Sequence, residues 1–413
     1  MKLPEIQLPL NLKNRLSLGH PWVYRNHLGH APKLATGSWV QVRCGNFTAY
    51  GLWDSRSPIA IRLFSSKGLP DQRWLQQQVA AAWETRAPLR TETAATNAYR
   101  WIFGEGDGLP GLTVDLYDRW AVVRAYSPSV EPIKPWLVEA LRYVNPLLKG
   151  IVERRTIGAV PDTVDASLER SGDDPDGVET KIQVLWGSLP PRDLTVTEHG
   201  LKFKANLFEG QKTGLFLDHR ENRLMLENWC RDNQIQSVLN CFSYTGAFSV
   251  YAARGGAQQI TSCDIAAQAS ADAMLNFGLN GFDPARHEFL SEDCFELLTR
   301  YGRAGRKFDL IILDPPTFAK ANKQVHAALR GYARLNQLAL KCLADDGFLA
   351  TASCTSYVSP EMFREMLAGA GQAVGKRLQI LHDAGQPLDH PVPAHFLEGR
   401  YLKFMLCRAR PAV

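Results

Sequence analysis

The sequence predicts a multidomain α/β protein whose C-terminal part is a Rossmann-like, mostly parallel sheet. From Ser237 onward, short apolar strands alternate with helices, which is the pattern of a parallel sheet. The first ~70 residues instead contain short strands separated by Gly, Pro and Ser turns, which is typical of a small β-barrel. A chain of 413 residues, 45% of them hydrophobic and 22% charged, is long enough for two or three domains with buried cores.

Composition excludes several classes of protein. The net charge of +5 permits a nucleic-acid partner without requiring one. The eight cysteines contain no CxxC pair, which argues against a disulfide framework or a zinc site, so we expect no metal and reduced thiols in the cytoplasm. The N-terminus carries Pro4 and Pro9 and lacks an apolar signal region, and no apolar run is long enough to span a membrane.

The first two units are expected at residues 1–75 and 76–190. Strands of the barrel are expected at 38–44, 48–54 and 60–65. The middle unit, a small α+β domain, is expected to contain a helix at 72–86, a β-hairpin within 108–127, a helix at 135–144 and an exposed acidic loop at 170–180.

The third unit, residues 191–413, is expected to form the parallel sheet. Its strands are predicted at 237–242, 259–265, 287–293, 308–316, 348–356, 377–383 and 401–409. Its helices are predicted at 249–256, 266–281, 294–302, 326–347 and 359–371. The last two strands have no helix between them and can therefore be antiparallel. Open sheets of this kind bind ligands at the carboxyl ends of their strands, so chemistry is expected just past each strand.

The first three strand ends carry candidate cofactor-binding residues. Gly246 permits a tight turn before a helix whose N–H groups are free to bind an anion, although a plain strand-to-helix turn explains it as well. Asp264 follows 18 residues later, where it can accept hydrogen bonds from ribose hydroxyls or begin the next helix. Asp293 stands at the equivalent place, and it can bind an adenine amino group or cap its helix.

The fourth strand ends in Asp314-Pro315-Pro316, with Phe318 close behind. Prolines contribute no N–H, so the carboxylate and the nearby carbonyl groups form a rigid set of acceptors. A base with an exocyclic amino group presents matching donors, and an aromatic ring can stack on an extruded base. The alternative is a rigid exit turn with a buried aromatic residue.

The fifth strand ends in Cys354, which lies 40 residues after Asp314 and one strand further along the predicted sheet. The two side chains can therefore face one cleft. A free cysteine is most often an inert core residue, but Cys354 is flanked by polar Ser353, Thr355 and Ser356. A nearby helix N-terminus would favour its thiolate, the form that acts as a nucleophile.

Two further patterns are set aside. The segment EGQKTG at 209–214 lacks the order of residues in a P-loop. His390 and His395 lack a ligand set for a metal and are interpreted as structural.

Taken together, these motifs resemble the bacterial 23S ribosomal RNA cytosine-C5 methyltransferases that carry an N-terminal PUA domain. The resemblance covers essentially the whole chain. It rests on GHPWVY at 19–24, GEGDGLPGLTVD at 104–115, GQKTGLFLDHRENR at 210–223, LNCFSYTGAFSVYA at 239–252, LDPPTFAK at 313–320, SCTS at 353–356, DHPV at 389–392 and EGRYLK at 398–403.

The resemblance implies a class I methyltransferase domain that uses S-adenosylmethionine (SAM), a PUA RNA-binding domain in the first 75 residues, and large-subunit ribosomal RNA as partner. Asp314 would hold the target cytosine, beside Pro315, Pro316 and Phe318, and Cys354 would be the nucleophile. Matching positions imply cofactor contacts by Asp218, Arg220, Ser243, Tyr244, Thr245, Gly246, Asp264 and Asp293.

The chemistry agrees with this interpretation. Cytosine C5 is a poor nucleophile, but addition of a thiolate to C6 produces an enamine whose C5 can attack a sulfonium methyl group. A carboxylic acid at the N3/N4 edge stabilises the charge that develops. Many relatives place a second Cys directly after the DPP-type motif to assist product release, and here that position is Thr317.

Two other functions stay open at this point. Methylation of an exocyclic amine on adenine or guanine also uses a [DN]PP-aromatic motif and needs no thiol. A non-catalytic RNA-binding assembly factor is the third reading. Contacts to RNA are expected to be electrostatic, and the sequence leaves the oligomeric state open, a homodimer included. The candidate RNA-binding residues are Arg15, Arg25, Arg56 and Arg62.

Overall fold

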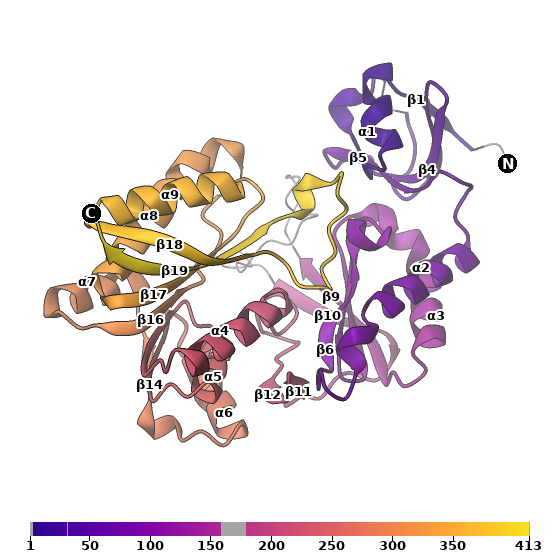
Figure 1. Ribbon diagram of the computed structural model, residues 1–413. Helices are drawn as coiled ribbons and strands as arrows, with labels where there is room; N and C mark the ends of the chain where they lie inside the picture. Colours follow the sequence, from indigo (N-terminus) through magenta and orange to yellow (C-terminus); the bar gives the residue numbers. More distant parts are fainter. Residues whose placement is uncertain (1–2, 31, 158–178, 320, 413) are drawn as a thin grey trace.

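The computed structural model describes residues 3–30, 32–157, 179–319 and 321–412. These residues form three successive units, each with its own principal β-sheet (Figure 1). The acidic segment expected as an exposed loop lies outside the described residues, apart from Glu179 and Thr180, which begin a strand. The predicted multidomain α/β class is confirmed.

The N-terminal unit is a five-stranded sheet in the order β1-β3-β4-β5-β2, in which only the β1–β3 pair is parallel. The three predicted strands are all present. Alternate residues of β3, Val40, Val42 and Cys44, point into the core, because successive side chains of a strand face opposite sides. The elements are β1 Glu5–Gln7, α1 Lys13–Ser17, β2 Trp22–Tyr24, β3 Trp39–Cys44, β4 Phe47–Trp53 and β5 Ile59–Ser65.

The middle unit combines a sheet in the order β10-β9-β8-β7-β6 with two helices. The predicted helices and hairpin are present. The predicted boundary between residues 75 and 76 falls inside α2, which packs against α3 and the middle sheet. The elements are α2 Gln72–Thr85, β6 Ala98–Phe103, β7 Leu112–Tyr117, β8 Trp120–Ala125, α3 Lys134–Val144, β9 Gly150–Ile157 and β10 Glu179–Gly187.

The C-terminal unit contains a seven-stranded sheet in the order β15-β14-β13-β16-β17-β19-β18. The first five strands are parallel, and β19 runs antiparallel to both of its neighbours, as the sequence predicted. The strands are β13 Ser237–Cys241, β14 Gln259–Asp264, β15 Glu288–Ser291, β16 Phe308–Leu313, β17 Leu343–Cys354, β18 Lys376–Ala384 and β19 Leu402–Pro411. A separate hairpin, β11 Thr195–Glu198 and β12 Leu201–Lys204, precedes the sheet.

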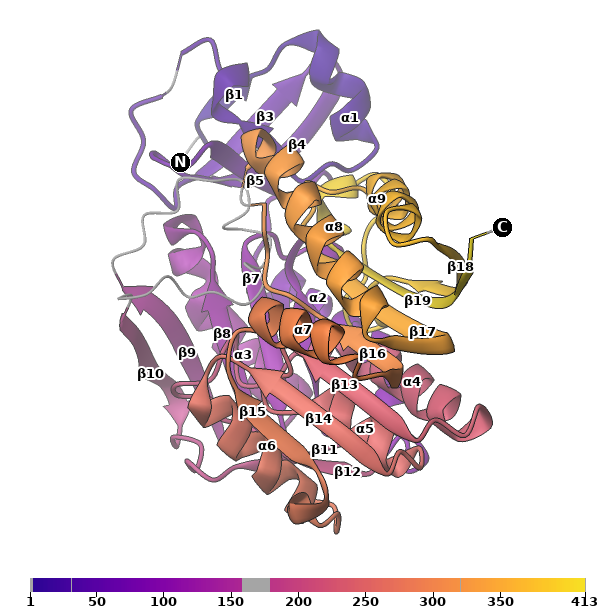
Figure 2. The ribbon, with the colours of Figure 1, turned by 90° about the vertical axis from the view of Figure 1, so that its left-hand side faces the viewer.

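Helices cover both faces of this sheet (Figure 2). The first three helices of the C-terminal unit, in chain order, pack on one face of the sheet, and its last three helices pack on the other face. Strand residues alternate accordingly: Leu310 and Ile312 join one core, and Ile311 and Leu313 join the other. The helices are α4 Arg220–Asp232, α5 Ala247–Arg254, α6 Ala267–Leu279, α7 Cys294–Ala304, α8 Val325–Lys341 and α9 Pro360–Gln372.

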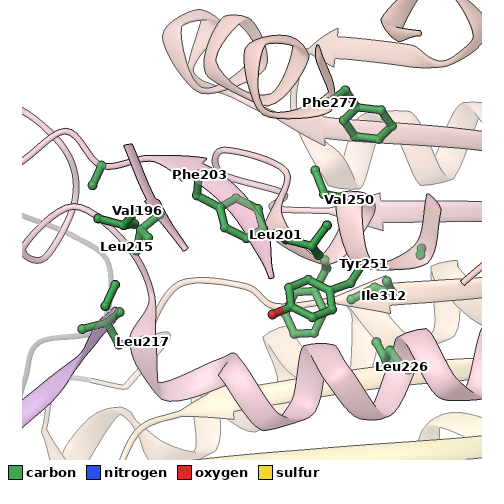
Figure 3. Packing of buried hydrophobic residues seen from close by; sticks show 14 of the residues in the cluster. Val196, Leu201, Phe203, Leu215, Leu217, Leu226, Val250, Tyr251, Phe277 and Ile312 are labelled. Atoms are coloured by element: carbon green, nitrogen blue, oxygen red, sulfur yellow. The ribbon is translucent and has the colours of Figure 1, made fainter. Parts of the chain in front are cut away.

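One hydrophobic core extends from the sheet to the β11–β12 hairpin and the middle unit (Figure 3). The ring of Phe203 on β12 stacks on that of Tyr251 on α5, with centroids 6.1 Å apart. Val122 of β8 belongs to the same cluster. The middle and C-terminal units are therefore joined by buried apolar contact, which holds them in a defined relative position.

Capping side chains explain the starts of α2, α7 and α9, and one helix end differs from the prediction. Ser359 caps α9 by accepting a hydrogen bond from the Met362 N–H, with Pro360 in the first turn. Helix α8 ends at Lys341, before the predicted end at 347, because Leu343 already pairs with Phe308 of β16. Sheet pairing thus overrides local helix propensity there. In the described ranges, no helix combines the length and apolar character needed to cross a bilayer.

The segment between β18 and β19, residues 385–401, connects all three units (Figure 1). Phe396 packs edge-on against Trp22 of the N-terminal unit, with centroids 4.7 Å apart, and Glu398 pairs with Arg15 at 2.6 Å. Asp389 in the same segment accepts two hydrogen bonds from Arg220 at the start of α4. It also accepts one from the Arg100 N–H of β6.

Replacing Asp389 by Ala should lower the free energy of unfolding by about 3–5 kcal/mol, because Arg220 would be left buried without a carboxylate. Both side chains of the pair are fully buried. Chemical denaturation followed by circular dichroism measures the change. Asp232→Ala is the control, because that side chain is 70% exposed and its loss should change stability by less than about 0.5 kcal/mol. If Asp389→Ala and Asp232→Ala lowered the free energy of unfolding equally, this would contradict the stabilising role assigned to the Arg220–Asp389 pair.

The same pair predicts a loss of stability in acid. Burial alone would raise the pKa of Asp389, but Arg220 and His390 hold the pKa well below its usual range. The folded state therefore binds this proton less readily than the unfolded state. The stabilisation is complete above the unfolded pKa of about 3.9 and is lost as the pH falls through the folded value. When the free energy of unfolding of the Asp389→Ala variant is measured as a function of pH, this loss of stability in acid should be absent.

Candidate active site

A cavity of about 340 Å³ lies at the carboxyl ends of the parallel strands. It is the place at which the strand order reverses, between β13 and β16. Most of the predicted site residues line it. They are Asp218, Ser243, Tyr244, Thr245, Asp264, Asp293, Asp314, Pro315, Pro316, Phe318 and Cys354.

The turn after β13 forms one wall. Gly246 has φ of +73°, and a Cβ there would lie 2.8 Å from the Cβ of Ala273, so only glycine fits without a shift. Gly246 supports the turn rather than lining the cavity. Tyr244 also adopts a positive φ, of 46°, and its N–H donates to the Asp264 carboxylate at 2.8 Å. The strand-to-helix turn is thus tied to the end of the neighbouring strand.

The two acids of the next strands both line the cavity, but only Asp293 has the capping role that the sequence left open. Asp264 lines the cavity while its Oδ1 accepts from the Ala266 N–H, and the N-cap of α6 is Ala266 itself. Asp293 is the N-cap of α7 and accepts from the N–H groups of Phe295 and Glu296. It also faces the cavity. Capping and ligand binding are therefore compatible at Asp293.

Asp218 lies on the opposite wall. Its Oδ2 accepts from Lys212 Nζ and from the Tyr401 hydroxyl, both at 2.7 Å. Its Oδ1 is buried and has no hydrogen-bond partner among the described residues. Burial alone would raise the pKa of Asp218, but the Lys212 ammonium holds the pKa far below its usual range. Asp218 thus presents a charged, unpartnered oxygen beside the cavity.

Arg220 differs from the expected cofactor contact. Its guanidinium is fully buried and bonded to Asp389, and it does not line the cavity. The resemblance to the family's motif marked the right segment, but the side chain of Arg220 points to the joint between the units. Its role in this structure is to anchor the start of α4, next to Asp218.

Asp314 and Cys354 lie on neighbouring strands and line the same cavity. Cys354 is half-buried, whereas the other seven cysteines are fully buried. Its Sγ lies 3.8 Å from the Pro315 carbonyl oxygen and 3.8 Å from Thr317 Oγ1, and that hydroxyl donates to the Cys354 carbonyl at 3.2 Å. The segment after β16 therefore holds the thiol and the carboxylate in one rigid unit.

Phe318 also lines the cavity, and its ring packs on Tyr332 of α8 with centroids 4.6 Å apart. This contact supports the ring from behind. The ring is half-buried, so a part of it stays accessible for stacking. The alternative interpretation, a rigid exit turn with a buried aromatic residue, does not describe this geometry, because the ring of Phe318 is only half-buried.

The four candidate RNA-binding arginines separate into two groups. Arg56 is exposed, and Arg15, 41% exposed, pairs with Glu398. Arg25 is half-buried and donates to the carbonyl oxygens of Asp54 and Ser57. Arg62 is 2% exposed and lies 3.8 Å from Asp54, so the prediction that it offers its charge to RNA is wrong.

Sequence reasoning missed three residues of the site. Lys212 stands in the segment that was set aside because it is not a P-loop, and Tyr401 stands just before the last strand. His219 lines the cavity, with Nε2 3.3 Å from Asp314 Oδ1. The signal that pointed to them was the order of motifs in the family resemblance, because no local pattern brings these segments together.

The fold and the cavity define the chain as a SAM-dependent methyltransferase with a PUA-like domain. The family model for S-adenosylmethionine-dependent methyltransferases matches residues 181–376, and that for PUA-like domains matches residues 6–66. The chain belongs to the family that includes the proteins named ribosomal RNA large subunit methyltransferase I. Its sequence is 33% identical to the Klebsiella pneumoniae (strain 342) protein of that name, over 98% of both chains.

Further comparisons agree. The Serratia proteamaculans protein of the same name is 35% identical over 94% of this chain and 95% of its own. A solved structure described as a SAM-dependent methyltransferase from Streptococcus mutans superposes with a TM-score of 0.82 and 23% identity, covering 98% of this chain and 100% of that one. A second, in complex with SAH, also has a TM-score of 0.82, with 24% identity and the same coverage.

The residues of the cavity fit SAM as cofactor. SAM carries positive charge on its sulfonium and amino groups, and Asp218 Oδ1 offers a buried carboxylate oxygen that lacks a partner in the described residues. Asp264 and Asp293 stand where the ribose and the base of a nucleoside are expected in this fold. The free N–H groups at the start of α5 suit the carboxylate of the cofactor.

Replacing Asp218 by Asn should weaken SAM binding by about tenfold or more, because a hydrogen bond to a charged group contributes about 1.5–3 kcal/mol. Isothermal titration calorimetry with SAM and with SAH measures the change. Asp272→Asn serves as control, because Asp272 of α6 pairs with Lys204 of β12 and does not line the cavity. Unchanged affinity in the Asp218 variant would remove that residue from the cofactor site.

Proposed function

We propose that this chain methylates C5 of a cytosine in large-subunit ribosomal RNA through a covalent adduct between Cys354 and C6. One observation carries the proposal: the Cys354 thiol and the Asp314 carboxyl group face the same cavity, beside the residues that fit SAM. The names of the relatives support the class of substrate, because those proteins are ribosomal RNA large subunit methyltransferases.

The reaction needs a nucleophile and an acid on the two sides of one pyrimidine. The Cys354 thiolate adds to C6, the π electrons of the C5–C6 double bond form a C4–C5 double bond, and N3 takes a proton from the Asp314 carboxyl group, which gives the enamine. Asp314 at the N3/N4 edge stabilises the charge that this addition develops. SAM supplies the methyl group, which C5 accepts. A water molecule then takes the C5 proton, the thiolate leaves C6 as the C5–C6 double bond re-forms, and N3 returns its proton to Asp314, which restores the aromatic ring.

The surroundings of the two side chains suit this reaction. Pro315 and Pro316 offer no N–H, so they leave the Asp314 oxygens for the base. Phe318 is supported by Tyr332 and can stack on an extruded cytosine. The PUA-like unit supplies the RNA-binding module, and its accessible positive charges include Arg15 and Arg56. Free thiols require reducing conditions, which fits an enzyme that acts on ribosomal RNA in the cytoplasm.

A covalent adduct tests the nucleophile directly. RNA that contains 5-fluorocytosine should trap the chain in the presence of SAM, because fluorine at C5 cannot leave as a proton does. The adduct, seen as a shifted band in a denaturing gel, should disappear in Cys354→Ala. Cys263→Ala, a change at a fully buried cysteine one residue before Asp264, should keep it. An adduct that survives Cys354→Ala would assign the nucleophile to another residue.

Turnover by the same variant separates the remaining functions. Loss of methyl transfer in Cys354→Ala supports C5 chemistry, whereas nearly intact turnover would favour methylation of an exocyclic amine. Failure of the intact chain to bind SAM would favour a non-catalytic assembly factor. Mass spectrometry of ribosomal RNA from cells that lack the protein gives the cellular result: one 5-methylcytosine should be missing, and an unchanged inventory would contradict the proposal.

A further inference from the structure

His219 is a buried side chain on the wall of the cavity to which the reaction described above gives no task. It is 2% exposed and stands at the end of a short 3-10 helix, Leu217–His219, immediately before α4. Its ring is packed edge-on against Phe248 and Phe404, with centroid distances of 5.4 and 5.8 Å. These two contacts restrict the tilt of the imidazole ring, so its two nitrogens point in fixed directions.

The contacts of the two nitrogens determine where the ring proton lies. The amide nitrogen of Asn222, one turn along α4, lies 3.1 Å from Nδ1. An amide NH₂ group only donates, so Nδ1 accepts and carries no proton. The proton of the neutral ring is then on Nε2. Nε2 lies 3.3 Å from Asp314 Oδ1, which is within the range of an ion pair, although the geometry is not that of a hydrogen bond in this structure.

We propose that His219 is a positioning residue: its Nε2–H tautomer, set by Asn222, holds Asp314 Oδ1 and thereby presents Oδ2 to the pyrimidine. This assignment rests on the proposed function of Asp314. A carboxylate that follows a strand and precedes two prolines has few backbone donors to orient it. The distance of 3.3 Å is long for a hydrogen bond, and such contacts commonly tighten when substrate binds.

The tautomer can be measured without any assay of activity. Two-bond ¹H–¹⁵N correlation spectra of the full chain, labelled at histidine, distinguish Nδ1–H from Nε2–H rings. Comparison with His219→Gln assigns the signal. An Nε2–H tautomer whose ¹⁵N shift changes in Asp314→Ala supports the proposal. An Nδ1–H tautomer, or an Nε2 shift that is unaffected by the loss of Asp314, overturns it.

Kinetics give the second test. His219→Leu removes the donor, and we expect the single-turnover rate of methyl transfer to fall by about 10- to 100-fold, the effect of a hydrogen bond to a charged group. His219→Gln places an amide N–H near the position of Nε2 and should stay within about threefold of the unchanged chain. SAM affinity, measured by calorimetry, should change by less than about threefold in both variants, because the donor acts on Asp314 rather than on the cofactor.

A matched control separates positioning from folding. His287 is a half-buried histidine that packs on Phe277 in the same domain and does not line the cavity, so His287→Leu should keep the full rate. If His219→Leu transfers the methyl group at the same rate as the unchanged chain, the proposal is overturned. It is also overturned if His219→Leu and His219→Gln both still bind SAM but lose the same fraction of the rate. If the unchanged chain forms no adduct with 5-fluorocytosine RNA, the proposed function fails, and the tautomer measurement still decides the His219–Asp314 contact.

Discussion

The buried ion pair between Arg220 and Asp389 is the constraint on which the geometry of this molecule depends. Burying two charges is costly, and such a pair persists only where hydrogen bonds satisfy both groups. Here the two charged groups meet through two hydrogen bonds, and Asp389 also accepts from the Arg100 N–H of the middle sheet. The pair therefore joins the start of α4, the segment between β18 and β19, and β6, at a point where none of them can move independently.

This anchor explains how the cavity acquires a second wall. The parallel sheet supplies one wall, because its strands deliver Asp314 and Cys354 at one edge. The other wall includes the segment before α4, which places Asp218 and His219 along the same cavity. The Tyr401 hydroxyl, from the segment that contacts Trp22 through Phe396, bonds Asp218 at 2.7 Å. The cofactor wall and the PUA-like unit are thus tied to the same piece of chain.

The strand ends were predictable from sequence, because a regular alternation of strands and helices places every strand's carboxyl end at one edge. The contacts that complete the site were not. Arg220 and Asp389 are 169 residues apart, and no local pattern connects them. Arg62 carries the same charge as Arg56, and only the packing of the barrel against the middle unit shows that Arg62 is buried. The early end of α8 likewise depends on pairing with β16.

The position of Cys354, rather than its type, distinguishes it from the other cysteines. Cys294 also lines the cavity, and Cys263 stands one residue before Asp264, but both are buried in the core. The close sulfur of Cys294, together with burial, raises the pKa of Cys263. Cys354 ends a strand held by the antiparallel β19, and the buried Lys403 of β19 donates to the Thr355 carbonyl just beyond it. The last, antiparallel strand thus fixes the residue that follows the thiol. An antiparallel strand of the sheet thereby helps to position the Cys354 thiol, the nucleophile of the proposed reaction.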